Sequence, residues 1–120
     1  MARNLAKSFS FALNGYSYAL KTQRNFRIQT VLGITTAILA FFFNFSRFEW
    51  MILLLVICFV LTSELVNTTL EAVVDLTTNG EISQKAKFAK DVSATVVLLT
   101  AVFAVFTGLL LFIPHLLQFI

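Results

Sequence analysis

Three long apolar runs dominate the chain and predict three membrane-spanning helices. They cover about residues 28–46, 50–70 and 92–113, and each approaches the roughly 20 residues that a helix needs to cross ~30 Å of hydrocarbon. The second helix is expected to continue past the membrane to Leu76, because neither glycine nor proline occurs before Asn79-Gly80. The third helix is expected to end near Pro114, since proline disrupts helix interiors.

Residues 3–22 show a different pattern. Apolar side chains recur at helical spacing, and most of the basic and amide side chains lie away from that face. This predicts an amphipathic helix at the membrane surface, although a helix docked on the bundle would fit the same pattern. The whole pattern therefore predicts a single integral-membrane domain over residues 1–120. Its fold class is an all-α membrane protein with an N-terminal amphipathic surface helix and three transmembrane helices.

Composition agrees with a membrane protein and excludes several other classes. Hydrophobic residues make up 58% of the chain and charged residues only 12%, too few to cover a soluble globular surface. The net charge is +3, but apolar runs separate the basic residues, so we expect no nucleic-acid partner. Cys58 is the single cysteine, which excludes a disulfide framework and a cysteine-based zinc site. The first 27 residues lack the apolar core of a cleavable signal peptide.

The basic residues predict the orientation in the bilayer. Only Arg47 lies in the turn between the first two apolar runs. The other eight precede the first run or lie between the second and third: Arg3, Lys7, Lys21, Arg24, Arg27, Lys85, Lys87 and Lys90. Because basic residues favour the cytoplasmic side, the N-terminus and the loop 77–91 are expected to be cytoplasmic.

A polar stripe marks the cytoplasmic part of the second helix. Glu64, Asn67, Glu71 and Asp75 follow one another at i, i+3, i+7 and i+11, so a helix brings all four to one face. A carboxylate at the centre of a membrane helix costs roughly 2.5–3.5 kcal/mol. Retaining several such groups on one face predicts an intramembrane functional site that both the cytosol and the lipid can reach.

The chemistry of this stripe points to metal and phosphate. Two carboxylates with an amide between them suit a divalent metal, or a base beside a metal. Lys87, Lys90 and Asp91 precede the third span, and lysines beside a metal site suit phosphate groups. Three alternatives remain open: a polar clamp between helices, a small ion-coupled transporter, and a purely structural membrane subunit.

Several segments together resemble one known family. They are Ser63-Glu-Leu-Val-Asn-Thr-Thr-Leu-Glu-Ala-Val-Val-Asp75, Ala86-Lys-Phe-Ala-Lys-Asp-Val-Ser-Ala94, Arg24-Asn-Phe-Arg27 and the pattern Ser8-Phe9, Ala12, Gly15-Tyr16. The chain resembles the prokaryotic diacylglycerol kinase and undecaprenol kinase family over essentially its whole length. The resemblance implies ATP-dependent phosphorylation of a membrane lipid alcohol, with Mg²⁺ as cofactor. It also implies a homotrimer with active sites shared between subunits, in the bacterial inner (cytoplasmic) membrane.

The resemblance also assigns roles along the polar stripe. Glu64 resembles the general base that takes the proton from the lipid hydroxyl, and Glu71 resembles the ligand of the metal bound to ATP. Asn67 would orient nucleotide or substrate, and Asp75 matches an aspartate nearer the adenine. The family's Lys-Asp pair, which contacts phosphate and nucleotide, corresponds to Lys90 and Asp91.

The N-terminal part matches the family less closely. The family usually has a glutamate before the Arg-Asn-Phe-Arg segment, where it shares the metal with the glutamate matched by Glu71; this chain has Gln23. An amide keeps an oxygen ligand but lacks the charge, so weaker metal binding is expected. Tyr16 is a further nucleotide-site candidate, and Lys7 and Arg3 are the nearest candidates for basic phosphate contacts on the surface helix.

Two segments bear on the substrate. The Arg-Asn-Phe-Arg segment and the Lys-Asp-Val-Ser-Ala run resemble the undecaprenol kinase branch. Undecaprenol is therefore the expected substrate, and diacylglycerol is the alternative. Both lipids present a primary hydroxyl at the membrane interface, and their tails meet only apolar surface.

Overall fold

The computed structural model describes residues 4–81 and 83–120, and these form four α-helices without any strand. The helices are α1 (Leu5–Thr22), α2 (Arg24–Phe42), α3 (Arg47–Thr78) and α4 (Gln84–Leu117). The last three are long and apolar enough to cross a membrane. The predicted all-helical fold with three spans is therefore confirmed. Arg3 lies outside the described residues.

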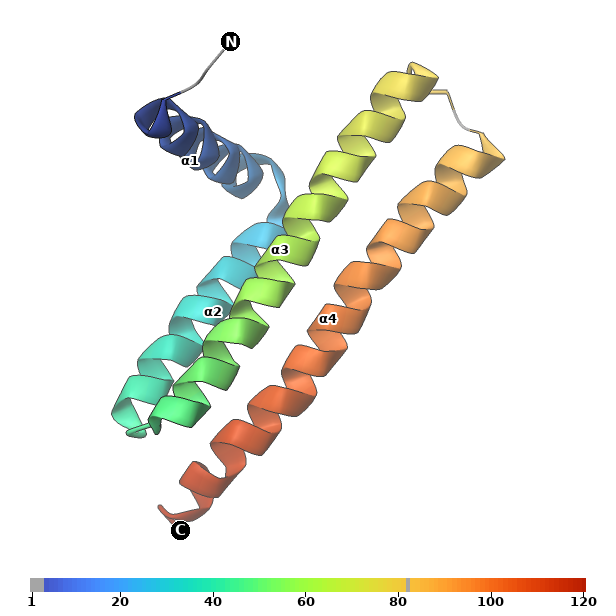
Figure 1. Ribbon diagram of the computed structural model, residues 1–120. Coiled ribbons are helices and arrows are strands. Elements are labelled where there is room, and N and C mark those ends of the chain that lie inside the picture. Colours follow the sequence, from blue (N-terminus) through green and yellow to red (C-terminus); the bar gives the residue numbers. More distant parts are fainter. Residues whose placement is uncertain (1–3, 82) are drawn as a thin grey trace.

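The first helix meets α2 at an angle and packs mainly against that helix (Figure 1). It begins at Asn4, whose side chain accepts a hydrogen bond from the Lys7 backbone N–H at 2.8 Å. It ends at Gln23, where an extended backbone turns the chain into α2. The Arg27 guanidinium donates to the carbonyls of Leu20 and Lys21, the last turn of α1, at 2.9 and 3.1 Å. These bonds satisfy helix-end carbonyls and fix the corner between α1 and α2.

The central helix of the bundle is α3, which packs against α2 on one side and α4 on the other. Gly33 permits close approach of α2, because an added Cβ there would lie 3.1 Å from Ile57 Cγ2. Ser63 and Thr100 share a hydrogen bond of 2.9 Å between α3 and α4. Polar pairs of this kind stabilise helix packing inside a membrane.

A polar and aromatic cluster joins α3 and α4 at the end of the bundle that holds the α2–α3 turn. Ser46 and Glu49 form a reciprocal capping box at the start of α3. The same Glu49 carboxylate lies 2.7 Å from His115 Nε2, and the His115 ring stacks on Phe45.

Helix α4 continues past Pro114 to Leu117, beyond the end expected from the sequence. Proline removes one helical hydrogen bond and crowds the preceding turn. Here the last turn is held by side-chain contacts with the α2–α3 end: His115 bonds to Glu49, and Phe119 packs edge-on against Phe43. Tertiary packing thus overrides the local preference for a helix stop.

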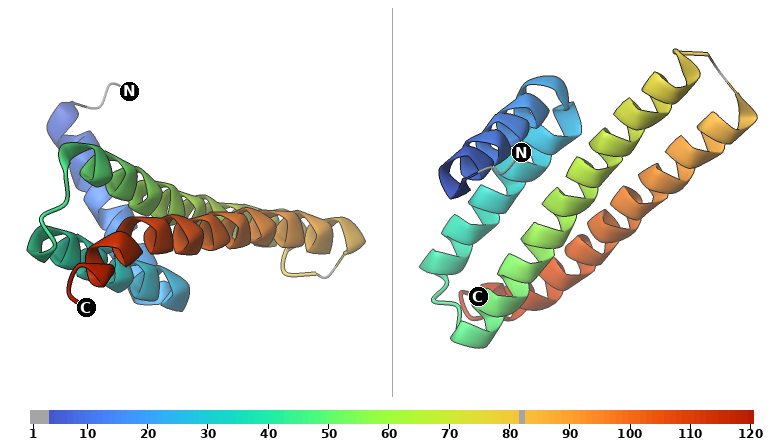
Figure 2. Two further views of the ribbon diagram at one scale, coloured as in Figure 1. Left: turned by 90° about the horizontal axis from the view of Figure 1, so that it is seen from below. Right: turned by 45° about the horizontal axis from the view of Figure 1, so that its top comes forward.

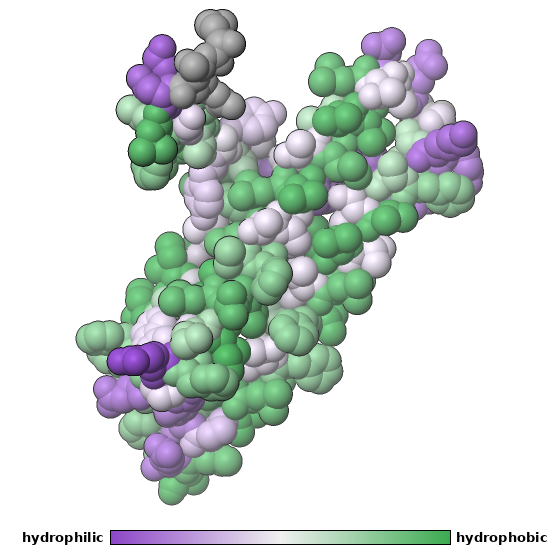
Figure 3. Space-filling view, viewed as in Figure 1, coloured by the Kyte–Doolittle hydropathy of each residue, from purple (hydrophilic) through white to green (hydrophobic). Residues whose placement is uncertain are grey.

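The two ends of the bundle carry different elements. The α3–α4 connection and α1 lie toward one end, whereas the α2–α3 turn and the C-terminus lie at the other (Figures 1 and 2). Figure 3 shows an apolar surface along the bundle, with hydrophilic residues gathered toward its ends and on α1. This distribution is typical of a bundle surrounded by lipid.

Candidate active site

The polar stripe lies where α3 approaches its neighbouring helices. Glu64 is 3% exposed and Asn67 8%, so both are buried within a single chain, while Glu71 is half-buried. The Asn67 amide donates to Glu71 Oε1 at 3.2 Å. The structure therefore brings together three residues that the sequence predicted to share one helix face.

Two oxygens of this group lack a partner. Glu64 Oε2 and Asn67 Oδ1 are buried, and neither makes a hydrogen bond to the described part of the chain. Buried polar atoms are nearly always paired in folded proteins. The Glu64 oxygen can therefore accept a proton from a hydroxyl group. Both oxygens can bind a cation, because they are of the hard type that Mg²⁺ prefers.

Gln29 on α2 joins the group and was not identified from the sequence. Its side chain lies close enough to the Glu64 carboxylate for the two to interact, and its Oε1 is buried without a partner in the described part of the chain. The first apolar run carries no charged residue, so a search for charged side chains finds no candidate there. Gln29 is the second residue of the first apolar run and the sixth residue of α2. An amide at that position would have been the signal, since such side chains usually need a polar partner in a membrane span.

The stripe lies near one boundary of the hydrocarbon. At ~1.5 Å per residue, the rise from Arg47 at the start of α3 to Glu64 is about 25 Å. A hydrocarbon core of ~30 Å then extends only slightly beyond Glu64. Glu71 and Asp75 follow further along the helix, toward the α3–α4 connection.

Charged residues of α3 and α4 pair at that end. Lys90 Nζ donates to Asp75 Oδ1 at 2.6 Å, and it lies close enough to Glu71 for their charges to interact. The hydrogen bond to Asp75 raises the pKa of the Lys90 ammonium, which precedes the apolar part of α4. Lys87 and Asp91 form a second pair at 2.8 Å. Both pairs are exposed, so the lysines can exchange their partners for phosphate oxygens at small cost.

The N-terminal candidates lie around α1. Gln23 occupies the junction between α1 and α2, and Lys7 is exposed on the first turns of α1. The Tyr16 hydroxyl is engaged with Thr30 at 3.1 Å, and its ring packs edge-on against Phe26. Tyr16 thus has a structural role at the α1–α2 corner, whatever else it contacts. Within residues 4–81 and 83–120, no three His, Cys, Asp or Glu side chains are grouped so that they could hold a metal.

Comparison with known proteins identifies the chain. The sequence model of the prokaryotic diacylglycerol kinase family matches residues 10–112. The chain belongs to this family. It is 44% identical to a diacylglycerol kinase of Synechocystis sp. over 98% of this chain and 67% of that protein. It is 38% identical to an undecaprenol kinase of Bacillus subtilis over 92% of this chain and 89% of that protein.

Membership of the prokaryotic diacylglycerol kinase family establishes the general activity. The protein is a lipid kinase, and its three apolar helices make it a multi-pass membrane protein. The expected family and enzyme class are therefore confirmed. ATP-dependent phosphorylation follows from the kinase activity.

Proposed function

We propose that this lipid kinase transfers the γ-phosphoryl group of ATP to the primary hydroxyl of undecaprenol, with Mg²⁺ as cofactor. The observation that carries the proposal is the buried Glu64 carboxylate, whose Oε2 has no partner at the edge of the hydrocarbon. A lipid hydroxyl at the interface reaches this depth while its tail remains in the bilayer.

In the proposed reaction Glu64 is the general base. Its unpaired oxygen accepts the hydroxyl proton as the hydroxyl oxygen attacks the γ-phosphorus, and ADP leaves. Gln29 holds the carboxylate from the α2 side. Lys90 exchanges Asp75 for a phosphate oxygen and offsets charge on the transferring group.

The donor atoms fit a magnesium ion. Glu71 and the Asn67 carbonyl offer hard oxygen ligands one turn apart on α3, and we propose Gln23 as a weaker ligand from the α1–α2 junction. Mg²⁺ would neutralise the β- and γ-phosphates of ATP. The remaining proposed nucleotide contacts are Asp75 toward the adenine, Asp91, Tyr16, and the basic residues Lys7 and Arg3.

The choice of undecaprenol rests on the likeness to the Bacillus subtilis protein and on the Arg-Asn-Phe-Arg and Lys-Asp-Val-Ser-Ala segments. Diacylglycerol is the second candidate, because the Synechocystis relative at 44% identity carries that name. Both substrates offer the same primary hydroxyl to Glu64.

Assembly and orientation complete the proposal. We propose a homotrimer with shared active sites, in the bacterial inner membrane, with α1 lying at the surface and the α3–α4 connection in the cytoplasm. The exposed apolar residues along α1 support contact with lipid or protein. The basic residues of α1, its junction and the α3–α4 connection favour the cytoplasmic side, where ATP is available.

The test is phosphate transfer by purified protein in detergent micelles. With labelled ATP and Mg²⁺, we expect labelled undecaprenyl phosphate, and slower labelling of diacylglycerol at equal mole fraction in the micelle. Omission of Mg²⁺ should abolish transfer. Faster labelling of diacylglycerol would reverse the substrate assignment, and labelling of neither lipid would contradict the proposed function.

A further inference from the structure

Within one chain, α1 is held mainly near its C-terminal end. Residues 4–15 are all exposed, whereas Tyr16 and Leu20 are half-buried and Ala19 is buried. The helix packs mainly against α2, where the Tyr16 ring meets the fully buried Phe26 ring edge-on, with 4.8 Å between the ring centroids. The direction of α1 is therefore decided at the corner that it forms with α2.

Arg27 closes that corner. A single residue with an extended backbone, Gln23, separates the two helices. Arg27 lies one turn further along α2, and its Nη1 donates to the carbonyls of Leu20 and Lys21 at 2.9 and 3.1 Å. Carbonyls in the last turn of a helix lack helical partners, and that end of the helix dipole favours a cation. The guanidinium thus reaches across Gln23 and ties the end of α1 to α2.

A second polar contact braces the same corner. The Tyr16 and Thr30 hydroxyls share a hydrogen bond of 3.1 Å, and Thr30 follows Arg27 by three residues on α2. Both braces therefore use the same part of α2. Together with the contact between the Tyr16 and Phe26 rings, they restrict a pivot of α1 at Gln23.

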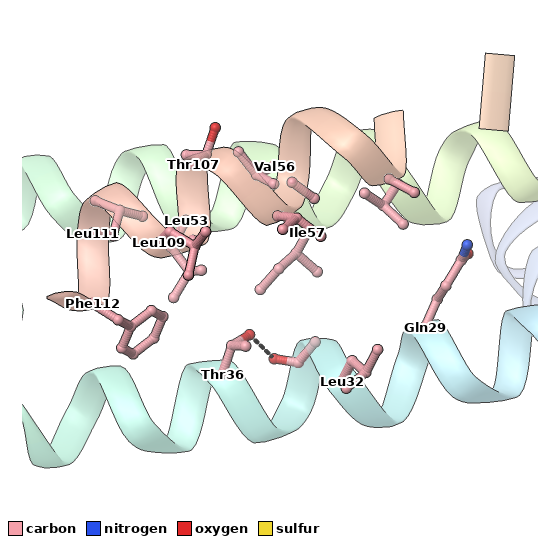
Figure 4. Close-up of a pocket in the computed structure, with 16 residues that line it drawn as sticks. Gln29, Leu32, Thr36, Leu53, Val56, Ile57, Thr107, Leu109, Leu111 and Phe112 are labelled. Atoms are coloured by element: carbon pink, nitrogen blue, oxygen red, sulfur yellow. Dashed lines mark hydrogen bonds between the residues drawn. The ribbon is translucent and has the colours of Figure 1, made fainter. Parts of the chain in front are cut away.

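The same part of α2 also meets the proposed base. Gln29 lies at one end of an apolar pocket between α2, α3 and α4 (Figure 4), close enough to the Glu64 carboxylate to interact with it. Residues two apart lie about 200° apart around a helix, so Arg27 and Gln29 leave α2 in nearly opposite directions. The first turns of α2 therefore support both α1 and the proposed base on α3.

The length of α1 amplifies any movement at the corner. From Gln23 to Lys7 the helix rises about 24 Å at ~1.5 Å per residue, so a pivot of ~10° moves Lys7 by about 4 Å. A hydrogen bond to phosphate does not survive a shift of that size. Gln23 lies in the pivot itself, so a loose corner affects the proposed metal ligand and the proposed phosphate contact together.

We infer that Arg27 is a positioning residue of the kinase reaction. By capping the end of α1 it holds Gln23 and the side chains of α1 where Mg²⁺-bound ATP needs them. The inference rests on the proposed function, because Gln23 and Lys7 are the groups that it positions. Arg27 acts on the nucleotide through the backbone of α1, so binding of the lipid alcohol beside Glu64 does not depend on it.

The kinetic test removes the two hydrogen bonds. Arg27→Met keeps an unbranched side chain but has no donor. If only about one tenth of the molecules then hold α1 in place, KM for Mg²⁺-ATP should rise about tenfold, with kcat and the KM for lipid nearly unchanged. Arg27→Lys should recover part of the affinity, because an ammonium can donate to both carbonyls. Thr30→Val removes the second brace without changing the charge and should raise the KM for Mg²⁺-ATP about threefold.

The matched control is Arg24→Met. It removes the same charge from the same turn of α2 and leaves both hydrogen bonds of Arg27 in place, so KM for Mg²⁺-ATP should stay nearly unchanged. An equal rise in Arg24→Met and Arg27→Met would assign the effect to charge and overturn the inference. Unchanged KM values in both Arg27→Met and Thr30→Val would overturn it as well.

A distance measurement follows the corner without catalysis. Spin labels on Ser10→Cys and Thr77→Cys, in a Cys58→Ala background and diluted with unlabelled protein, report the position of α1 relative to α3 by pulsed electron resonance. Without ATP or lipid, Arg27→Met should broaden the distance distribution and Arg24→Met should not. Equal widths in the two variants would reject the clamp. A broadened distribution with unchanged nucleotide affinity would make Arg27 a purely structural residue and reject the inference too.

A binding measurement keeps this inference separate from the proposed function. A fluorescent ATP analogue, titrated with Mg²⁺ in the absence of lipid, gives a dissociation constant without turnover. About tenfold weaker binding to Arg27→Met than to Arg24→Met would support the positioning role even if the unaltered protein phosphorylated no undecaprenol. Equal binding to the two variants would reject the role and leave the kinase reaction to be judged by phosphate transfer.

Discussion

Replacement of Glu64 by glutamine tests the proposed base most directly. Glu64→Gln keeps the size of the side chain and its ability to bond to Gln29, but an amide cannot accept the hydroxyl proton. Because Glu64 is 3% exposed, water cannot readily replace it as the base. General-base catalysis contributes about 10²–10⁴-fold, so lipid phosphorylation should fall by that factor, or about 3–5 kcal/mol of transition-state stabilisation.

Stability should respond differently from activity. One oxygen of the Glu64 carboxylate is buried without a partner in the described part of the chain. Replacing this carboxylate by an amide leaves no opposite charge unpaired, so Glu64→Gln should unfold at the same temperature as the unaltered protein or slightly higher. Initial rates with labelled ATP and undecaprenol in micelles give the activity, and thermal unfolding in the same detergent gives the stability.

The control makes the same chemical change elsewhere. Glu81 lies exposed in the α3–α4 connection, and Glu81→Gln should retain full activity. Turnover by Glu64→Gln within about threefold of the unaltered protein would refute the base assignment. Loss of activity together with loss of the folded state would instead assign Glu64 to packing between α2 and α3.

Further predictions concern the metal, the topology and the polar cluster of Glu49 and His115. Gln23→Glu should lower the Mg²⁺ concentration that gives half-maximal activity and raise the rate of lipid phosphorylation about tenfold. An unchanged Mg²⁺ dependence would mean that position 23 does not reach the metal. In a Cys58→Ala background, Phe48→Cys should react with a membrane-impermeant thiol reagent in intact cells and Lys87→Cys should not; the opposite labelling reverses the orientation. Glu49→Gln weakens a half-buried charged hydrogen bond and should cost about 1–3 kcal/mol of stability without changing kcat; an unchanged unfolding temperature contradicts that role.

Much of the architecture follows from local pattern alone. Length and hydropathy predicted three spans, and four helices with three apolar spans are present in residues 4–81 and 83–120. The spacing of Glu64, Asn67 and Glu71 predicted that they share a face, and helical geometry brings them together whatever else the chain does. The end of the second helix near Asn79-Gly80 was also predicted. Both residues adopt a positive φ there, which asparagine and glycine tolerate best.

Contacts between helices depended on tertiary structure. Hydropathy and period give the direction of a side chain around its own helix, but not the crossing angle or the vertical register of two helices. Those quantities decide that Gln29 reaches Glu64, that Ser63 meets Thr100, and that His115 meets Glu49. They also carry α4 past Pro114 and leave an apolar pocket between α2, α3 and α4, since both features depend on how closely neighbouring helices pack.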